Sequence, residues 1–213
     1  MKKVISIILA IVITGIGLTI AFSYQTPKTK TYLTLTEIDK KIENETTVND
    51  LTVEKNVSQL HEAVQALITL GETYTEGTET DQAFEAFNQA YDETKKLEAQ
   101  LAEFIKTDVT SKLEKTTSAL TEDQKKVATE AIDAEKKRLD TLKTFNQQLS
   151  ALNKNLKGLK ENFDQDKPST AIQYFNSVTT SFNQVKDSYN DYVEATNQYY
   201  QLKEKLYEVL KTA

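Results

Sequence analysis

The sequence predicts an all-α protein: an elongated antiparallel bundle of three to four helices, with coiled-coil-like packing, after an N-terminal transmembrane or signal segment. Three observations support this fold class. Apolar residues recur in steps of three and four along most of the chain after residue 35, which is the helical period. The 213 residues include only 5 glycines and 2 prolines, so few positions interrupt a helix. No useful length alternates apolar and polar residues, which makes a β-sheet improbable.

Residues 1–22 are predicted to be a signal-anchor. Lys2 and Lys3 precede nineteen uncharged positions, residues 4–22. A helix of this length crosses a hydrocarbon core of about 30 Å. The apolar region of a cleaved signal peptide is usually shorter, about 7–15 residues, so an uncleaved anchor is favoured. Ala21 and Ser23 are small residues at the positions that a signal peptidase reads, so cleavage and secretion are the alternative.

Lys2 and Lys3 also predict the orientation of this segment. Under the positive-inside rule they place the amino terminus in the cytoplasm and residues 23–213 outside, as a single-pass protein of the cell membrane. Lys28 and Lys30 follow the apolar segment at close range and favour the reverse orientation, which is the minority alternative.

Composition limits the partners of the remaining chain. Residues 23–34 are polar and contain Pro27, which predicts a stalk, and residues 35–213 form the predicted extracytoplasmic bundle domain. The whole chain carries a net charge of −6, and without the two leader lysines the rest carries about −8. This charge, with Arg138 as the single arginine, argues against nucleic acid or an anionic lipid surface as a partner. Since the chain has no cysteine, it has neither disulfides nor a lipoprotein anchor.

Two helical segments are predicted in the first half of the domain. The first spans about residues 36–74, with a weak helix-forming stretch at residues 46–50 that predicts a bend or break. The second spans about residues 81–115. Their apolar stripes consist of Val53, Val57, Leu60, Val64 and Leu67 in the first, and Phe84, Phe87, Tyr91, Leu97, Leu101, Ile105 and Leu113 in the second.

Two longer helical segments are predicted in the second half. One begins at a capping box, in which Thr121 is followed three residues later by Gln124. The other begins near Ser169, after Pro168. Their stripes consist of Leu142, Phe145, Leu149, Leu152, Leu156, Leu159 and Phe163, and of Phe175, Val178, Phe182, Val185, Tyr189, Tyr192, Thr196, Tyr199, Leu202 and Leu206. Short connections predict that the segments pack as antiparallel neighbours.

The residues needed for most catalytic chemistry are missing. His61 is the only histidine, and it has Gln65 where a zinc-peptidase motif needs a second histidine. A cysteine nucleophile, a glycine-rich phosphate loop and a serine nucleophile elbow are likewise missing from the sequence. We therefore predict no catalytic residues, no metal, no cofactor and no enzyme activity.

Tyrosines of the last segment are the one cluster above background. Packing in or near the core is the simpler interpretation of most of them. Tyr200 and Tyr207 lie beside the apolar stripe and Tyr174 flanks it, so these three are the candidate partner surface. Val193 shares the seven-residue spacing of Tyr200 and Tyr207, and this stripe either closes the bundle or joins two copies.

These features predict a non-catalytic, membrane-anchored extracytoplasmic protein that acts as an interaction or scaffold module at a bacterial cell surface. Its partner would be a protein, the cell wall or a copy of itself. A secreted helical effector and a ligand-binding sensor bundle are the alternatives. The composition is similar to that of small Gram-positive surface proteins, including helical cell-wall-binding lipoproteins, although the cysteine that those lipoproteins carry is missing here.

Overall fold

The computed structural model describes residues 26–45, 50–73, 78–106, 110–164 and 168–211. These residues form a helical bundle without a strand, which confirms the predicted all-α class. The helices are α2 (Pro27–Glu45), α3 (Asp50–Thr73), α4 (Thr78–Ile105), α5 (Thr110–Thr117), α6 (Glu122–Asp164) and α7 (Pro168–Lys211). The predicted signal-anchor, with Lys2, Lys3, Ala21 and Ser23, lies outside the described residues. None of the described helices is long and apolar enough to cross a membrane.

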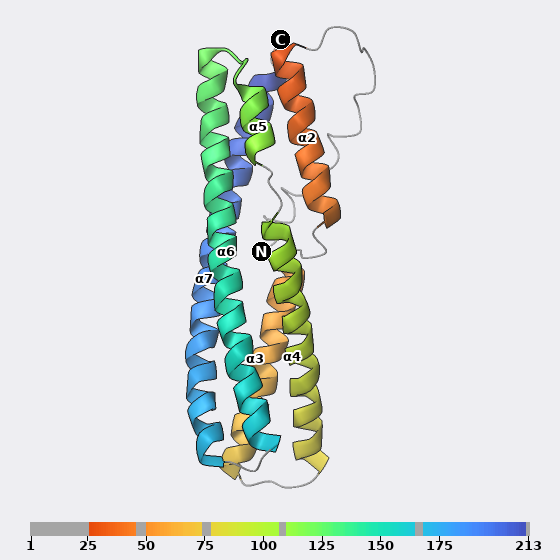
Figure 1. The fold of residues 1–213 in the computed structure, drawn as a ribbon, viewed down its shortest axis with the longest axis vertical. Coiled ribbons are helices and arrows are strands. Elements are labelled where there is room, and N and C mark those ends of the chain that lie inside the picture. Colours follow the sequence, from red (N-terminus) through yellow and green to blue (C-terminus); the bar gives the residue numbers. More distant parts are fainter. Residues whose placement is uncertain (1–25, 46–49, 74–77, 107–109, 165–167, 212–213) are drawn as a thin grey trace.

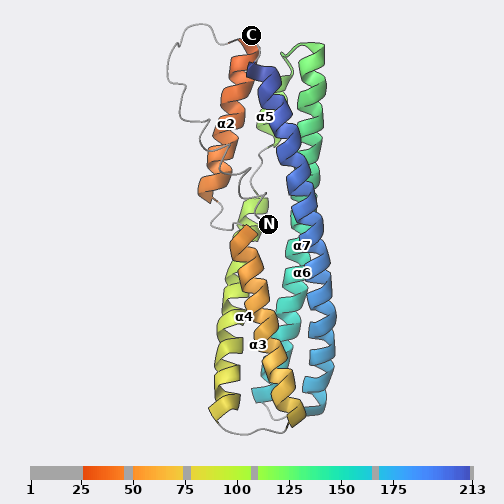
Figure 2. The same cartoon turned by 180° about the vertical axis from the view of Figure 1, so that it is seen from behind.

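Helices α6 and α7 form an antiparallel hairpin that runs the whole length of the molecule (Figure 1). At 43 and 44 residues, they are each about 65 Å long. The shorter helices α3 and α4 lie along one half of this hairpin, and α2 and α5 lie along the other half (Figure 2). Both halves are therefore four-helix arrangements that share the same two long helices.

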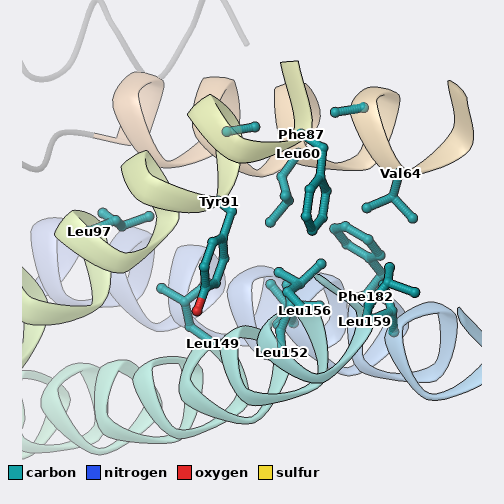
Figure 3. Packing of buried hydrophobic residues seen from close by; sticks show 14 of the residues in the cluster. Leu60, Val64, Phe87, Tyr91, Leu97, Leu149, Leu152, Leu156, Leu159 and Phe182 are labelled. Atoms are coloured by element: carbon teal, nitrogen blue, oxygen red, sulfur yellow. The ribbon is translucent and has the colours of Figure 1, made fainter. Parts of the chain in front are cut away.

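A large core fills the half that contains α3 and α4. Apolar side chains from α3, α4, α6 and α7 point toward one another there (Figure 3). From Leu142 to Leu159, the leucine and phenylalanine stripe of α6 is fully buried in this core, as the heptad spacing predicts. The side chain of Phe163, the last member of the predicted stripe, lies outside the described residues. The buried members of this core are Leu60, Ala63, Val64, Leu67, Ala83, Phe87, Ala90, Tyr91, Leu97, Leu101, Phe104, Leu142, Phe145, Leu149, Leu152, Leu156, Leu159, Val178, Phe182 and Val185.

A small core fills the half that contains α2 and α5. Helices α2, α5, α6 and α7 each contribute side chains to it, and the half-buried Tyr32 and Tyr207 pack against it. Its buried members are Leu35, Leu113, Leu120, Ala128, Ala131, Ile132, Leu206 and Leu210.

The predicted starts of the two long helices are confirmed. The backbone N–H of Thr121 donates to Oε1 of Gln124 at 3.3 Å, which is one half of the predicted capping box. Glu122 is the first residue of α6, and Pro168 is the first residue of α7. A proline fits the first helical position because its backbone has no N–H to satisfy there.

The stalk predicted at residues 23–34 requires a correction, because residues 27–34 belong to α2. The backbone N–H of Thr29 donates to Oγ1 of Thr26 at 3.3 Å, so Thr26 caps a helix whose first residue is Pro27. Thr31 and Leu35 are buried against the bundle. The proline and threonines that suggested an extended linker are therefore a helix start signal.

The segment predicted as one helix at residues 81–115 is two helices. Helix α4 ends at Ile105, and α5 begins at Thr110. At the end of α4, the backbone N–H of Lys106 donates to the carbonyl oxygen of Glu103 at 3.2 Å. This bond spans three residues, as in a 3₁₀ turn, where an α-helical bond spans four. The intervening sequence, Thr-Asp-Val, has low helix propensity. Helix α2 ends at Glu45 and α3 begins at Asp50, and the bend or break predicted at residues 46–50 lies almost entirely outside the described residues.

Candidate functional site

The site with the most unusual chemistry is a buried group of charged and aromatic side chains, which we call the Arg138 cluster. It lies where α4 ends, against the first half of α6 and the last third of α7. Along α6 and α7, its residues separate the large core from the small core. Its members are Phe104 of α4, Glu135 and Arg138 of α6, and Tyr199, Tyr200 and Lys203 of α7.

Glu135 and Arg138 form a two-pronged ion pair inside this cluster. The Nε of Arg138 donates to Oε2 of Glu135 at 2.6 Å, and Nη2 donates to Oε1 at 2.7 Å. The exposed fractions are 2% for Glu135 and 3% for Arg138. By contrast, the side chains of the Lys96–Glu93 and Lys143–Asp140 pairs are 44–72% exposed, so water reaches those pairs but not the Glu135–Arg138 pair. These two parallel hydrogen bonds engage both carboxylate oxygens and two of the five N–H donors of the guanidinium.

Cations and aromatic rings alternate across the cluster. The guanidinium carbon of Arg138 lies 5.8 Å from the ring centre of Phe104 and 5.4 Å from that of Tyr199. Lys203 is only 3% exposed, and its Nζ lies 5.4 Å from the ring centre of Tyr199 and 4.6 Å from that of Tyr200. Cation–aromatic contacts of this kind contribute roughly 0.5–2 kcal/mol each, more when water is excluded. The cluster therefore links α4, α6 and α7 at a single level of the bundle.

The local electrostatics keep Arg138 charged. Burial by itself would lower the pKa of Arg138, but the hydrogen bonds and the negative charge of Glu135 outweigh that effect and raise the pKa above its ordinary value. A guanidinium that stays protonated and is bound by a carboxylate does not release a proton at ordinary pH. The pair therefore suits a structural role better than acid–base catalysis.

An open groove lies beside the cluster, between the outer faces of α6 and α7. Nζ of Lys137 donates to Oε1 of Gln198 at 3.3 Å across it. The groove is open and carries charged side chains of both signs, whereas a site for a small molecule encloses most of its ligand. Its lining residues are Glu130, Asp133, Ala134, Lys137, Gln198 and Leu202.

The three tyrosines of the predicted partner surface are each half-buried and lie at separate places on the bundle. Tyr200 belongs to the Arg138 cluster, with Lys203 over its ring. Tyr207 packs edge-to-face on Tyr32 of α2, with ring centres 5.2 Å apart. Tyr174 packs against the large core and covers Gly158. The structure does not bring the three together, and their binding role remains a prediction.

His61 is on the exposed surface of α3, where its ring meets that of Phe182 edge-to-face at 5.2 Å. Among the residues that the structure describes, no three or more His, Cys, Asp or Glu side chains are grouped as a metal site would require. The predicted absence of a metal and of a cofactor remains a prediction.

The burial of Glu135, Arg138 and Lys203 was not predicted from the sequence. The signal was present in the heptad of α6, because its three- and four-residue steps continue from Leu142 back through Arg138 and Glu135. Likewise, the buried stripe of α7 steps from Tyr199 to Lys203, whereas the predicted stripe continued from Tyr199 to the apolar Leu202. Charged residues at seam positions were set aside because most charged residues are solvated.

The chain was compared with protein-family models, curated proteins and solved structures, and no match was found in any of the three comparisons. The class that the fold and the Arg138 cluster define is a helical bundle with a buried ion pair between two cores.

Removing one partner of the buried ion pair should destabilise the protein strongly. Arg138→Met leaves the Glu135 carboxylate buried without its partner, which typically costs about 3–5 kcal/mol. The double variant Glu135→Leu with Arg138→Met removes both charges, and we expect it to recover most of that loss. Urea unfolding followed by circular dichroism measures both.

The matched control is the exposed pair of Lys143 and Asp140, which has the same spacing on the same helix. Lys143→Met should cost less than about 1 kcal/mol. Equal losses for Arg138→Met and Lys143→Met would contradict the structural role of the buried pair.

Gly158 is required by the ring of Tyr174. A Cβ at position 158 would overlap that ring, so Gly158→Ala should destabilise the fold by about 1–3 kcal/mol despite the better helix propensity of alanine. In a Tyr174→Leu background the overlap is relieved, and the same change should be neutral or stabilising. Thermal unfolding of the four proteins gives the comparison. Stabilisation by Gly158→Ala with Tyr174 in place would contradict the close contact between Gly158 and the ring of Tyr174.

Proposed function

We propose that the protein is a non-catalytic helical module, anchored in a bacterial cell membrane by residues 1–22, that holds an interaction surface outside the membrane. The observation that carries this proposal is where the described chain begins. Pro27 starts α2 at the end of the bundle where α7 also ends (Figures 1 and 2). There, the hydroxyl of Thr31 donates to the carbonyl oxygen of Thr116 at 3.0 Å, and Tyr32 packs on Tyr207.

An anchor that enters at one pole attaches the bundle end-on. Only a few residues separate the predicted span from Pro27, so this pole would lie next to the bilayer. Helices α6 and α7 extend about 65 Å from it. The half of the bundle with α3 and α4 would then stand tens of ångströms from the membrane, which is the geometry of a spacer or scaffold.

The surface chemistry favours a macromolecular partner. The groove between α6 and α7 is open and carries Glu130, Asp133 and Lys137, and such mixed charge is typical of the polar rim of protein interfaces. A protein, a cell-wall polymer or a second copy of the chain are the candidate partners. The buried charges of the Arg138 cluster are engaged with one another, which supports a structural rather than a catalytic function.

Intact mass, membrane fractionation and external proteolysis of the full chain in whole bacterial cells test the proposal together. We expect full-length mass in the membrane fraction and digestion of the bundle by protease added outside. Lys2→Glu with Lys3→Glu should reduce external digestion, because these lysines hold the amino terminus inside. Lys28→Glu with Lys30→Glu is the matched control and should leave digestion unchanged or increased.

Each alternative predicts a different result. A mass beginning after Ser23, found in the medium, would replace the anchored module by the secreted effector. Full-length membrane protein that external protease cannot reach would reverse the orientation. Membrane protein whose hydrogen exchange changes on addition of a small molecule would favour the sensor bundle.

A further inference from the structure

The short helices form two pairs that meet almost exclusively through the long hairpin. Helix α2 contacts α5 and α7, and α5 contacts α6, whereas α3 contacts α4, and α4 contacts α6. Neither α2 nor α5 has an extensive contact with α3 or α4. Opening one pair would therefore leave the contacts of the other pair intact.

The two cores differ in size. Among the described residues, twenty buried side chains make up the large core and eight make up the small core, three of which are alanine or isoleucine on α6. Among the side chains of α2 that the structure describes, residues 27–37, Leu35 belongs to the small core, and Thr31 and Thr34 are buried beside it. Stabilisation by apolar burial scales with the area removed from water, so the half containing α2 is the less stable.

The Arg138 cluster weakens the coupling between the cores. Between them the seam of α6 carries the charged residues Glu135 and Arg138, and the seam of α7 carries Lys203, so the apolar contact between the two cores is reduced. Leu139 is the partly buried side chain that packs against both cores. Regions of few buried contacts open locally at a lower free energy than the global unfolding of the protein.

We infer that α2 and α5 form a releasable unit that opens while α3, α4 and the helix segments packed on them stay folded. Helix α2 then acts as a strap between the N-terminal segment and the bundle. The strap contains 19 residues, and a released chain of that length reaches at most about 65 Å when fully extended. Its use as an extensible tether at a membrane rests on the anchored attachment proposed above, whereas the opening itself does not.

Hydrogen–deuterium exchange of the full chain, resolved by mass spectrometry of peptides, tests this inference. Under conditions in which exchange reports the opening equilibrium, amides of α2 and α5 should exchange at least about tenfold faster than those in the centres of α3 and α4. The parts of α6 and α7 in the large core should be as protected as α3 and α4. One common level of protection across all helices would overturn the inference.

A matched pair of substitutions assigns the exchange to the two cores. Leu35→Ala removes the α2 member of the small core, and we expect it to accelerate exchange in α2 and α5 about tenfold or more. The same variant should change exchange in α3 and α4 less than about twofold. Leu60→Ala, in the large core, should show the opposite pattern.

Acceleration of all helices by Leu35→Ala would mean that the bundle opens as one unit, and would overturn the inference. The Leu60→Ala protein keeps this test meaningful if the Leu35→Ala protein does not fold, because it must then accelerate α3 and α4 more than α2 and α5. Exchange measures only the opening, and cell fractionation measures only the anchoring. Failure of the strap and failure of the anchored function are therefore distinguishable.

Discussion

The buried ion pair between Glu135 and Arg138 is the constraint on which the rest of the structure depends. Two charges removed from water are tolerated only while they stay paired and hydrogen-bonded, and both prongs of this pair are short. The pair fixes the rotation of α6, since any other rotation would separate the guanidinium from the rings of Phe104 and Tyr199. The level at which α4, α6 and α7 meet is set by the same contacts.

This constraint explains why one bundle contains two cores. The long helices α6 and α7 are continuous past the Arg138 cluster, whereas the other side of the bundle is made of separate pairs above and below it. Each pair is packed on its own apolar cluster, and the larger cluster gives α3 and α4 the firmer hold. The inferred difference in opening between the two halves is consistent with the proposed module, which is attached at one end and binds its partner elsewhere.

Much of the fold follows from the sequence, because helical period and capping are local properties. The seam of α6, the capping box at Thr121 and the proline start of α7 are examples. The start of α2 was wrongly predicted as a stalk, because polar residues and a proline are typical both of a linker and of a capped helix start. The burial of Leu35, a tertiary contact, distinguishes the two. The Arg138 cluster was not predicted, because a charged side chain on the buried stripe of α6 is screened from water only if groups on other helices, such as the rings of Phe104 and Tyr199, surround it. That is a tertiary property, as is the scattering of the three candidate tyrosines.

The most direct test of the two-core account is the distance between spin labels at the two ends of α6, measured by pulsed electron–electron double resonance. Asp123 and Glu161 are exposed, and the chain has no native cysteine, so Asp123→Cys and Glu161→Cys label cleanly. If α6 continues past the Arg138 cluster as one helix, the backbone separation is about 57 Å and the distribution is narrow. A much shorter or broad distribution would show that α6 breaks between the cores, and would contradict the account.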